Sequence, residues 1–198
     1  MAQSIPPIDI TALTFHPLTG DRWSDLERLF GEHGACGGCW CMYWRYMRAD
    51  YEAGKGESNR RAFENLVREG PPPGVLAYID GAPVGWCAVA PRANLLRLSQ
   101  SFILKPVDDQ PVWSVSCFYV DPAWRRGHVS LALLRSALAL VKEQGGKIVE
   151  GYPVMQGHSH LPPAFAWTGF LSTFLEAGFT ECARRSETRP VMRLTLPD

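Results

Sequence analysis

Apolar and polar positions recur along the chain with the two periods that distinguish strands from helices. Short apolar, β-branched runs predict strands over residues 8–15, 75–79, 83–89, 112–120, 147–154, 180–183 and 190–196. Apolar residues at helical spacing predict helices from about Ser24 and over 58–68, 126–143 and 168–177. The first helix opens with the capping-box pattern Ser24-Asp25-Leu26-Glu27 and should end near Gly31 or Gly34. Residues 92–107 and 157–167 fit neither period and are expected to be irregular or loops.

The order of these elements limits the topology. Asp80-Gly81 lies between two strands and predicts a tight hairpin, so those strands should be antiparallel. A long apolar helix joins strand 112–120 to strand 147–154, which predicts a right-handed crossover and a parallel pair. We therefore expect an α/β (α+β) fold with a mixed sheet and helices on both faces.

Composition narrows the class of protein. The 198 residues suit one domain, 1–198, and 46% hydrophobic content is enough for a sizeable core. Twenty basic and twenty acidic residues cancel, so the net charge favours neither a nucleic-acid partner nor an anionic membrane. The first residues lack the pattern of a signal peptide, and no run approaches the roughly 20 apolar residues of a membrane helix. We expect a cytoplasmic protein with reduced cysteines.

The passage over residues 113–134 carries the strongest chemical signal. A strand is followed by a Pro turn, then Arg125, Arg126 and Gly127, then an apolar helix. The first turn of a helix leaves backbone N–H groups unpaired, and the helix dipole adds partial positive charge there. Together with the two arginines, this pattern predicts a site for phosphate oxygens.

This passage resembles the cofactor motif of the GNAT acetyltransferase superfamily. In that motif a strand ends in Val-x-Pro-x-aromatic-Arg and leads through a Gly-containing turn into an apolar helix. The matching positions are Val120, Pro122, Trp124 and Arg125. The chain departs from the motif at His128, where Gly is usual, and at Ser130, where Gly or Ala is usual. The passage 170–179, which ends in Gly178-Phe179, is similar to the last helix of the family.

The resemblance implies a mostly antiparallel sheet in which the parallel strands splay apart near residues 118–120 and 150–152. Acetyl-CoA would be the co-substrate, with its pantetheine in the gap and its pyrophosphate on the turn. The implied cofactor-binding residues are Phe118, Tyr119, Val120, Arg125, Arg126, Gly127, His128, Val129 and Ser130. The implied activity is that of an N-acetyltransferase that passes the acetyl group directly to a small amine.

Acetyl transfer to an amine needs a group that takes the amine proton and a group that protonates the leaving thiolate. In many relatives a Tyr on the last helix protonates the thiolate, but Phe174 stands at the matching position. Glu150 and Tyr152 lie two residues apart on a strand and so share a face, which makes them the expected base and acid. The alternative is an anchoring Glu150 and a core Tyr152. Cys117 is a further candidate, either as a nucleophile or as a small packed thiol.

The cysteines near residue 40 allow a second interpretation. Cys36 and Cys39 have metal-ligand or redox spacing, with Cys41 and His33 nearby. Cys39 and Cys41 are too close in sequence to suit one ion, so we assign no metal. The alternative to an enzyme is a non-enzymatic acyl-CoA-binding or metal- or redox-responsive module of the same fold that uses this loop.

Aromatic residues follow the cysteines and are candidates for the acceptor pocket. Trp40, Tyr43 and Trp44, together with His158 on a later loop, are the expected substrate-binding residues. The alternative is that the aromatic side chains belong to the core and that the histidine is exposed to solvent. The expected partner is a small-molecule amine, and a homodimer is possible.

Overall fold

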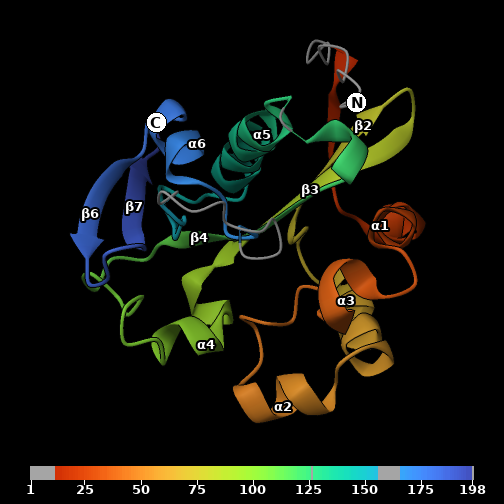
Figure 1. The fold of residues 1–198 in the computed structure, drawn as a ribbon, viewed down its shortest axis with the longest axis horizontal. Coiled ribbons are helices and arrows are strands. Elements are labelled where there is room, and N and C mark those ends of the chain that lie inside the picture. The colour runs from red at the N-terminus through yellow and green to blue at the C-terminus, as the bar shows by residue number, and fades with distance from the viewer. Residues whose placement is uncertain (1–11, 126, 156–165, 198) are drawn as a thin grey trace, which may run out of the picture.

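The computed structural model describes residues 12–125, 127–155 and 166–197. Its strands form one seven-stranded sheet in the order β1-β2-β3-β4-β5-β7-β6 (Figure 1). The strands are β1 (Thr14–Pro17), β2 (Gly74–Ile79), β3 (Ala82–Pro91), β4 (Trp113–Val120), β5 (Ile148–Gly151), β6 (Thr180–Arg184) and β7 (Pro190–Thr195). Neighbouring strands are antiparallel, except that β4 and β5 are parallel. The parallel pair and the hairpin through Asp80-Gly81 are thus confirmed.

Helices cover both faces of this sheet. On one face α5 (Val129–Glu143) and α6 (Leu171–Glu176) pack on a core that includes Val115, Leu133 and Phe174. On the other face α1 (Trp23–Phe30) and α3 (Glu57–Glu69) bury a second core around Trp86. The mixed sheet with helices on both faces, predicted from the element order, is confirmed.

Two short helices were not expected from the sequence. They are α2 (Arg48–Ala53) and α4 (Leu96–Ser99), which lie below the sheet in Figure 1. Each spans less than two turns, so neither shows the repeating apolar face by which longer helices are recognised. Within the described residues, no helix combines the length and the apolar character needed to cross a membrane.

Several predicted boundaries were wrong. The first strand was expected at 8–15 but is Thr14–Pro17, and residues 8–11 lie outside the described residues. Helix α1 begins at Trp23, so Ser24 lies inside it and caps nothing, because a 3₁₀ turn leads directly into the helix. Helix α5 begins at Val129 rather than at 126, since the preceding residue has left-handed backbone angles. Strand β5 and helix α6 are each shorter than predicted.

An irregularity in β4 separates it from β5. In the register of β3 and β4, Ala88 pairs with Cys117 and Val89 with Val115, so Ser116 is an extra residue. Such a bulge bends a strand and increases its twist. Pairing between β4 and β5 ends one residue earlier, at Val115 and Gly151, although β4 continues to Val120. The two parallel strands therefore part at the bulge and leave a gap, as the predicted fold requires.

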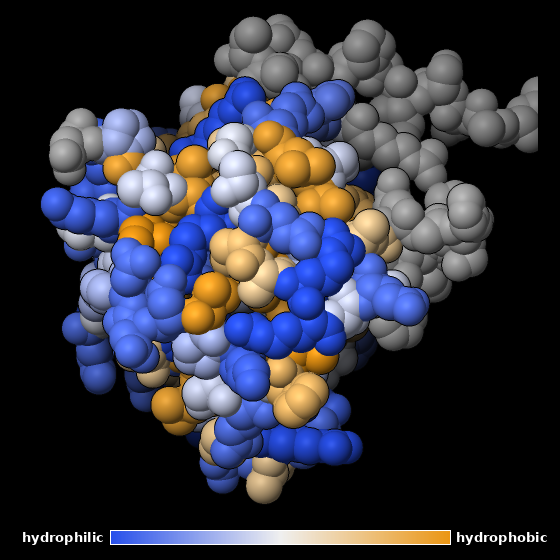
Figure 2. Space-filling model, turned by 90° about the vertical axis from the view of Figure 1, so that its left-hand side faces the viewer, coloured by the Kyte–Doolittle hydropathy of each residue, from blue (hydrophilic) through white to orange (hydrophobic). Residues whose placement is uncertain are grey.

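The edge of the sheet at β6 carries charged residues. Figure 2 shows this side of the molecule, where polar and charged residues are interspersed with apolar ones. Glu181 and Arg184 on β6 form an ion pair of 2.5 Å. Charged side chains on an edge strand discourage pairing with the strands of other chains.

The end of β5 is packed tightly against α6. Phe174 on α6 is fully buried and contacts Phe118 and Phe179, with ring centroids 6.1 and 5.0 Å away. A methyl group on Gly151 would overlap the Phe174 ring. Phe174 therefore closes one side of the strand gap with an apolar ring.

This contact predicts the cost of a small change. Gly151→Ala should lower the free energy of unfolding by about 1–3 kcal/mol, because overpacking forces the Phe174 ring to move. Gly20→Ala is the control, since a methyl group there makes ordinary contacts at 3.5 Å or more. Chemical denaturation of both variants measures the difference, and equal stabilities would show that the gap is not closed by this ring. Combining Gly151→Ala with Phe174→Leu should recover part of the loss.

Candidate functional site

The turn between β4 and α5 folds back on the end of the strand. Residues Pro122–Trp124 form a 3₁₀ turn, which the Asp121 carboxylate caps by accepting a hydrogen bond of 2.9 Å from the Ala123 amide. The Arg125 Nε donates to the Val120 carbonyl at 2.9 Å. This bond holds a guanidinium beside the last residue of β4 and close to the start of α5. Arg126, predicted as a neighbour in this site, lies outside the described residues.

His128 takes the backbone conformation for which the family motif uses glycine. Its φ is 58° and its ψ is 10°, and it is the residue that precedes α5. A side chain in this region costs about 1–2 kcal/mol of strain. The His128 side chain is exposed and makes no capping hydrogen bond. The chain therefore has histidine where the motif has glycine, but the backbone keeps the conformation of the turn.

The first turn of α5 suits an anion. The amides of Val129 and Ser130 lie at the N-terminus of a 15-residue helix and have no partner within it. With the helix dipole and Arg125, they form a positive patch at the end of the strand gap. The residues present therefore fit the phosphate groups that the motif predicts, with Gly127 leading into the turn.

Within the gap, β4 presents Phe118 and Tyr119 to opposite faces of the sheet. Phe118 packs under α5 and α6, whereas Tyr119 packs against Phe30 with ring centroids 5.4 Å apart. The Phe118 amide donates to the Trp167 carbonyl at 2.6 Å. A ligand that pairs with this amide must therefore displace the carbonyl of Trp167.

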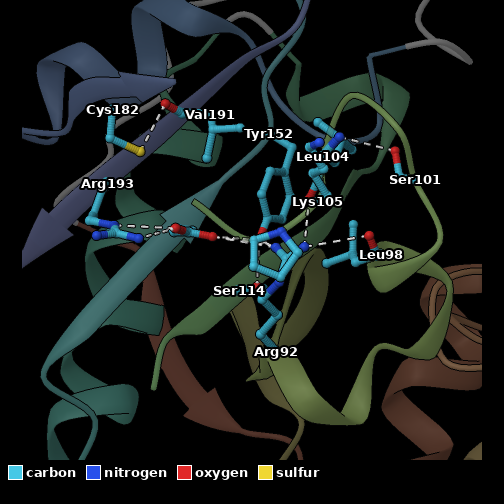
Figure 3. A network of polar contacts seen from close by, with 12 residues as sticks. Arg92, Leu98, Ser101, Leu104, Lys105, Ser114, Tyr152, Cys182, Val191 and Arg193 are labelled. Carbon is cyan, nitrogen blue, oxygen red and sulfur yellow. Dashed lines mark hydrogen bonds and ion pairs between the residues drawn. The ribbon is translucent and has the colours of Figure 1, made fainter. Parts of the chain in front are cut away.

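Glu150 and Tyr152 lie together, as their spacing predicts, but both are buried in an ion-pair network (Figure 3). Glu150 is 1% exposed. Its Oε1 accepts from Arg193 Nη2 at 2.7 Å, and its Oε2 accepts from Arg92 Nη1 at 3.4 Å. The Tyr152 hydroxyl donates to the same Oε2 at 3.1 Å. Both carboxylate oxygens thus have cationic donors.

The Tyr152 hydroxyl is the centre of the network. It lies 2.7 Å from the Ser114 hydroxyl and accepts from Arg92 at 2.5 Å. Arg92 also donates to the carbonyls of Leu98 and Leu104, so it ties the α4 segment to β5. Burial is the main cause that raises the pKa of Tyr152 above its ordinary value. A buried phenol with a raised pKa keeps its proton at neutral pH.

A hollow of about 380 Å³ borders this network. Its wall includes Glu150, Arg92 and Arg193, together with the acidic residues Asp108 and Asp109. Arg193 also binds Asp108 at 2.6 Å, and this hydrogen bond lowers the pKa of Asp108 to about 2. The hollow gives a small molecule room beside the carboxylate. Sequence reasoning missed both arginines, because each lies more than 40 residues from Glu150 and no local pattern links them.

The predicted acceptor residues lie in different surroundings. Trp40 is 3% exposed and packs between Trp23 and Phe30, with centroids 5.9 and 5.7 Å away, so its ring is part of the core. Tyr43 and Trp44 form an aromatic cluster with Trp167, at centroid distances of 5.0 and 5.5 Å.

A cation lies over this aromatic cluster. The Arg97 guanidinium is 4.0 Å from the centre of the Tyr43 ring. His158, the fourth predicted acceptor residue, lies outside the described residues.

The three cysteines of the loop lie in different surroundings. Cys36 is exposed on the tight turn Gly34–Gly38, and Cys39 and Cys41 are half-buried. Among the described residues, no group of three or more His, Cys, Asp or Glu side chains is arranged to hold a metal ion. Cys41 instead contacts Cys117 of β4, a pairing that the local Cys spacing did not suggest.

Comparison with known proteins agrees with this geometry. The model of the acetyltransferase (GNAT) family matches residues 40–154, more than half of the chain. A search of curated proteins found no match.

Solved structures show the same fold at low sequence identity. PaiA N-acetyltransferase from Thermoplasma acidophilum, in complex with coenzyme A, has a TM-score of 0.51 and 14% identity, covering 93% of this chain and 99% of its own. YncA from Salmonella typhimurium, with acetyl-CoA, has a TM-score of 0.53 and 14% identity, covering 94% and 95%. A GNAT-family acetyltransferase from Listeria monocytogenes has a TM-score of 0.56 and 9% identity, covering 93% and 95%.

The segment that the family model matches includes both the strand gap and the turn that leads into α5. We conclude that this chain belongs to the GNAT family of acetyltransferases.

Proposed function

We propose that the chain is one N-acetyltransferase domain that transfers the acetyl group of acetyl-CoA directly to a small amine. The observation that carries the proposal is the position of the α5 N-terminus at the open end of the gap between β4 and β5. Structural relatives bound to coenzyme A and acetyl-CoA support the choice of co-substrate. Acetyl-CoA would supply the acetyl group as an activated thioester.

The residues of the turn would bind the phosphate groups. The amides of Val129 and Ser130, with Arg125 and Gly127 beside them, supply donors and positive charge where the gap ends. Arg126 and the exposed His128 would add to this side of the ligand. The pantetheine would run along Phe118–Val120, where β4 is no longer paired with β5, and would displace the Trp167 carbonyl from the Phe118 amide.

The acceptor would bind on the opposite face from α5. The half-buried Tyr43 is the best-placed aromatic candidate there, while Trp44 and Trp40, which are both buried, would support it from the core. His158 is retained as a candidate from the sequence. Binding there would bring an amine towards the gap from the side of α1–α4, so that the two substrates would meet at the bulge.

Glu150 and Tyr152 are proposed as the proton-handling pair, through the network that holds them. The neighbouring hollow would give an amine access to the Glu150 carboxylate, and the Tyr152 phenol retains a proton for donation. The two arginines would fix the carboxylate in place. The acid role falls to Tyr152 because Phe174 has no hydroxyl group.

The first test asks whether the protein binds and uses acetyl-CoA. Calorimetric titration should show saturable binding, and thiol release should appear with some member of a panel of amino acids, polyamines, aminoglycosides and peptides. No binding at about millimolar acetyl-CoA, the range of a weak complex, would refute the proposal. Binding without turnover on any amine would instead support a non-enzymatic acyl-CoA-binding module.

A charge placed in the first turn of α5 tests the phosphate site. Ser130→Asp should weaken coenzyme A binding at least about tenfold, since a carboxylate would face the phosphate oxygens. The same change should leave stability equal or raise it by about 0.3–1 kcal/mol, because an acidic residue favours a helix N-terminus. Ser136→Asp, two turns along the helix, is the matched control and should leave affinity unchanged. Unchanged affinity in Ser130→Asp would place the phosphates elsewhere.

Substitution of Glu150 tests the network and the proposed base together. Glu150→Gln should lower the free energy of unfolding by about 3–5 kcal/mol, because the carboxylate is buried, Arg92 loses its carboxylate partner and Arg193 keeps only Asp108. In protein kept folded at low temperature, turnover should fall at least about tenfold with little change in acetyl-CoA affinity. Asp108→Asn is the control, since it removes an exposed partner of the same Arg193 and should change the stability far less than Glu150→Gln does. Unchanged turnover would remove Glu150 from the mechanism.

A further inference from the structure

The thiol of Cys41 lies in an environment that favours its negative form. The indole Nε1 of Trp86 donates to the Cys41 Sγ at 3.2 Å. Cys117 on β4 lies opposite Ala88, which is two residues along β3 from Trp86 and on the same face of the sheet. Both thiols pack against the core that contains Trp86 and Ala88, so the Cys41 sulfur is held by a tertiary contact on the face where β4 presents Cys117.

A buried cation completes this environment. Arg45 is 8% exposed, and its guanidinium lies 5.9 Å from the centre of the Phe63 ring. Burial lowers the pKa of Arg45, and a negative charge at Cys41 would raise it. Within the described residues, no carboxylate forms a salt bridge with Arg45. A buried guanidinium without a counter-charge is costly, so an anionic sulfur at Cys41 would balance it.

The backbone presents the thiol in an unusual conformation. Trp40 and Cys41 are consecutive non-glycine residues with positive φ, 42° and 57°. Such angles persist only when surrounding contacts hold them, and they concentrate at functional sites. Here the burial of Trp40 in the core and the Trp86 bond to Cys41 supply those contacts. Both Cys41 and Cys117 are half-buried, so a small reagent can reach them.

We propose that Cys41 and Cys117 form a peroxide-sensitive thiol pair that closes to a disulfide at the edge of the strand gap. The Cys41 thiolate would attack one oxygen of a hydroperoxide, breaking the O–O bond and giving a sulfenic acid and water or alcohol. The Cys117 thiol would then attack this sulfur, forming the S–S bond and releasing water. Two thiols would be oxidised and one peroxide reduced, and an added dithiol would reverse the change.

The position of the disulfide would affect the proposed acetyl-transfer site. Cys117 is the residue next to the Ser116 bulge, and its side chain packs on the α1–α3 side of the gap. A disulfide would tie the cysteine loop to β4 where the two substrates are proposed to meet. This consequence rests on the proposed acetyl-transfer function, whereas the disulfide itself does not.

The charged and titratable groups around Cys41 support its role as the thiol that attacks the peroxide. The neighbouring Cys117 thiol, the indole of Trp86 and the charge of Arg45 lower the pKa of Cys41, whereas its burial acts in the opposite direction. Cys39 and Cys87 are the other ionisable groups near it, and burial raises the pKa of each. Cys41 is therefore the thiol of this group whose surroundings most favour ionisation.

The experiment is treatment of the full-length, reduced protein with equimolar hydrogen peroxide, followed by thiol counting and peptide mapping. We expect the loss of two thiols and a Cys41–Cys117 peptide, reversed by dithiothreitol. Cys41→Ser should abolish the crosslink, whereas Cys36→Ser, in the same loop but exposed, should leave it intact. A crosslink between Cys36 and Cys39, or oxidation without any crosslink, would overturn the proposal.

Two further arms make the result specific. Arg45→Gln should slow the peroxide reaction at neutral pH about tenfold, the effect of about one pKa unit, while Arg48→Gln on the surface should not. Equal rates in the two variants would rule out Arg45 as the counter-charge and overturn the thiolate assignment. Acetyl-CoA turnover is then compared in reduced and oxidised protein. If the reduced protein shows no turnover, only the proposed acetyl-transfer function is contradicted. The disulfide proposal is judged on the crosslink alone.

Discussion

The extra residue at Ser116 is the constraint on which the rest of this structure depends. One residue more in β4 than in β3 bends the strand and ends its pairing with β5 after three residue pairs. Beyond that point β4 continues without pairing with β5, and its end leads into the turn and the N-terminus of α5. Without this extra residue β4 would lack the local bend that turns it away from β5.

The two sides of the gap are held by different kinds of interaction. On the α6 side, Phe174 fills the space above Gly151 with an aromatic ring. On the α4 side, Glu150 joins Arg92 and Arg193 in a buried network with Tyr152. The apolar side excludes water by packing, whereas the polar side is rigid only if every donor and acceptor is satisfied. Phe174 on α6 has no hydroxyl group, whereas Tyr152 places one on the opposite face of the sheet.

The proposed thiol pair lies beside the same bulge. Cys117 follows Ser116, and its side chain meets Cys41 from a loop more than 70 residues earlier. Trp86 on the neighbouring strand and Arg45 beside the loop complete the surroundings. If the proposals for acetyl transfer and for peroxide sensitivity both hold, they share one place, so the redox state of the cysteines would govern access to the bulge.

The sequence by itself determined what local periodicity and motifs encode. The hairpin at Asp80-Gly81, the parallel pair joined by α5, and the turn at Val120–Ser130 were all predicted, because each depends on residues close in the chain. Only the tertiary structure decided the partners of Glu150, the core position of Trp40 and the contact between Cys41 and Cys117. Those contacts join residues tens of positions apart, and no local pattern records which distant side chains the sheet brings together.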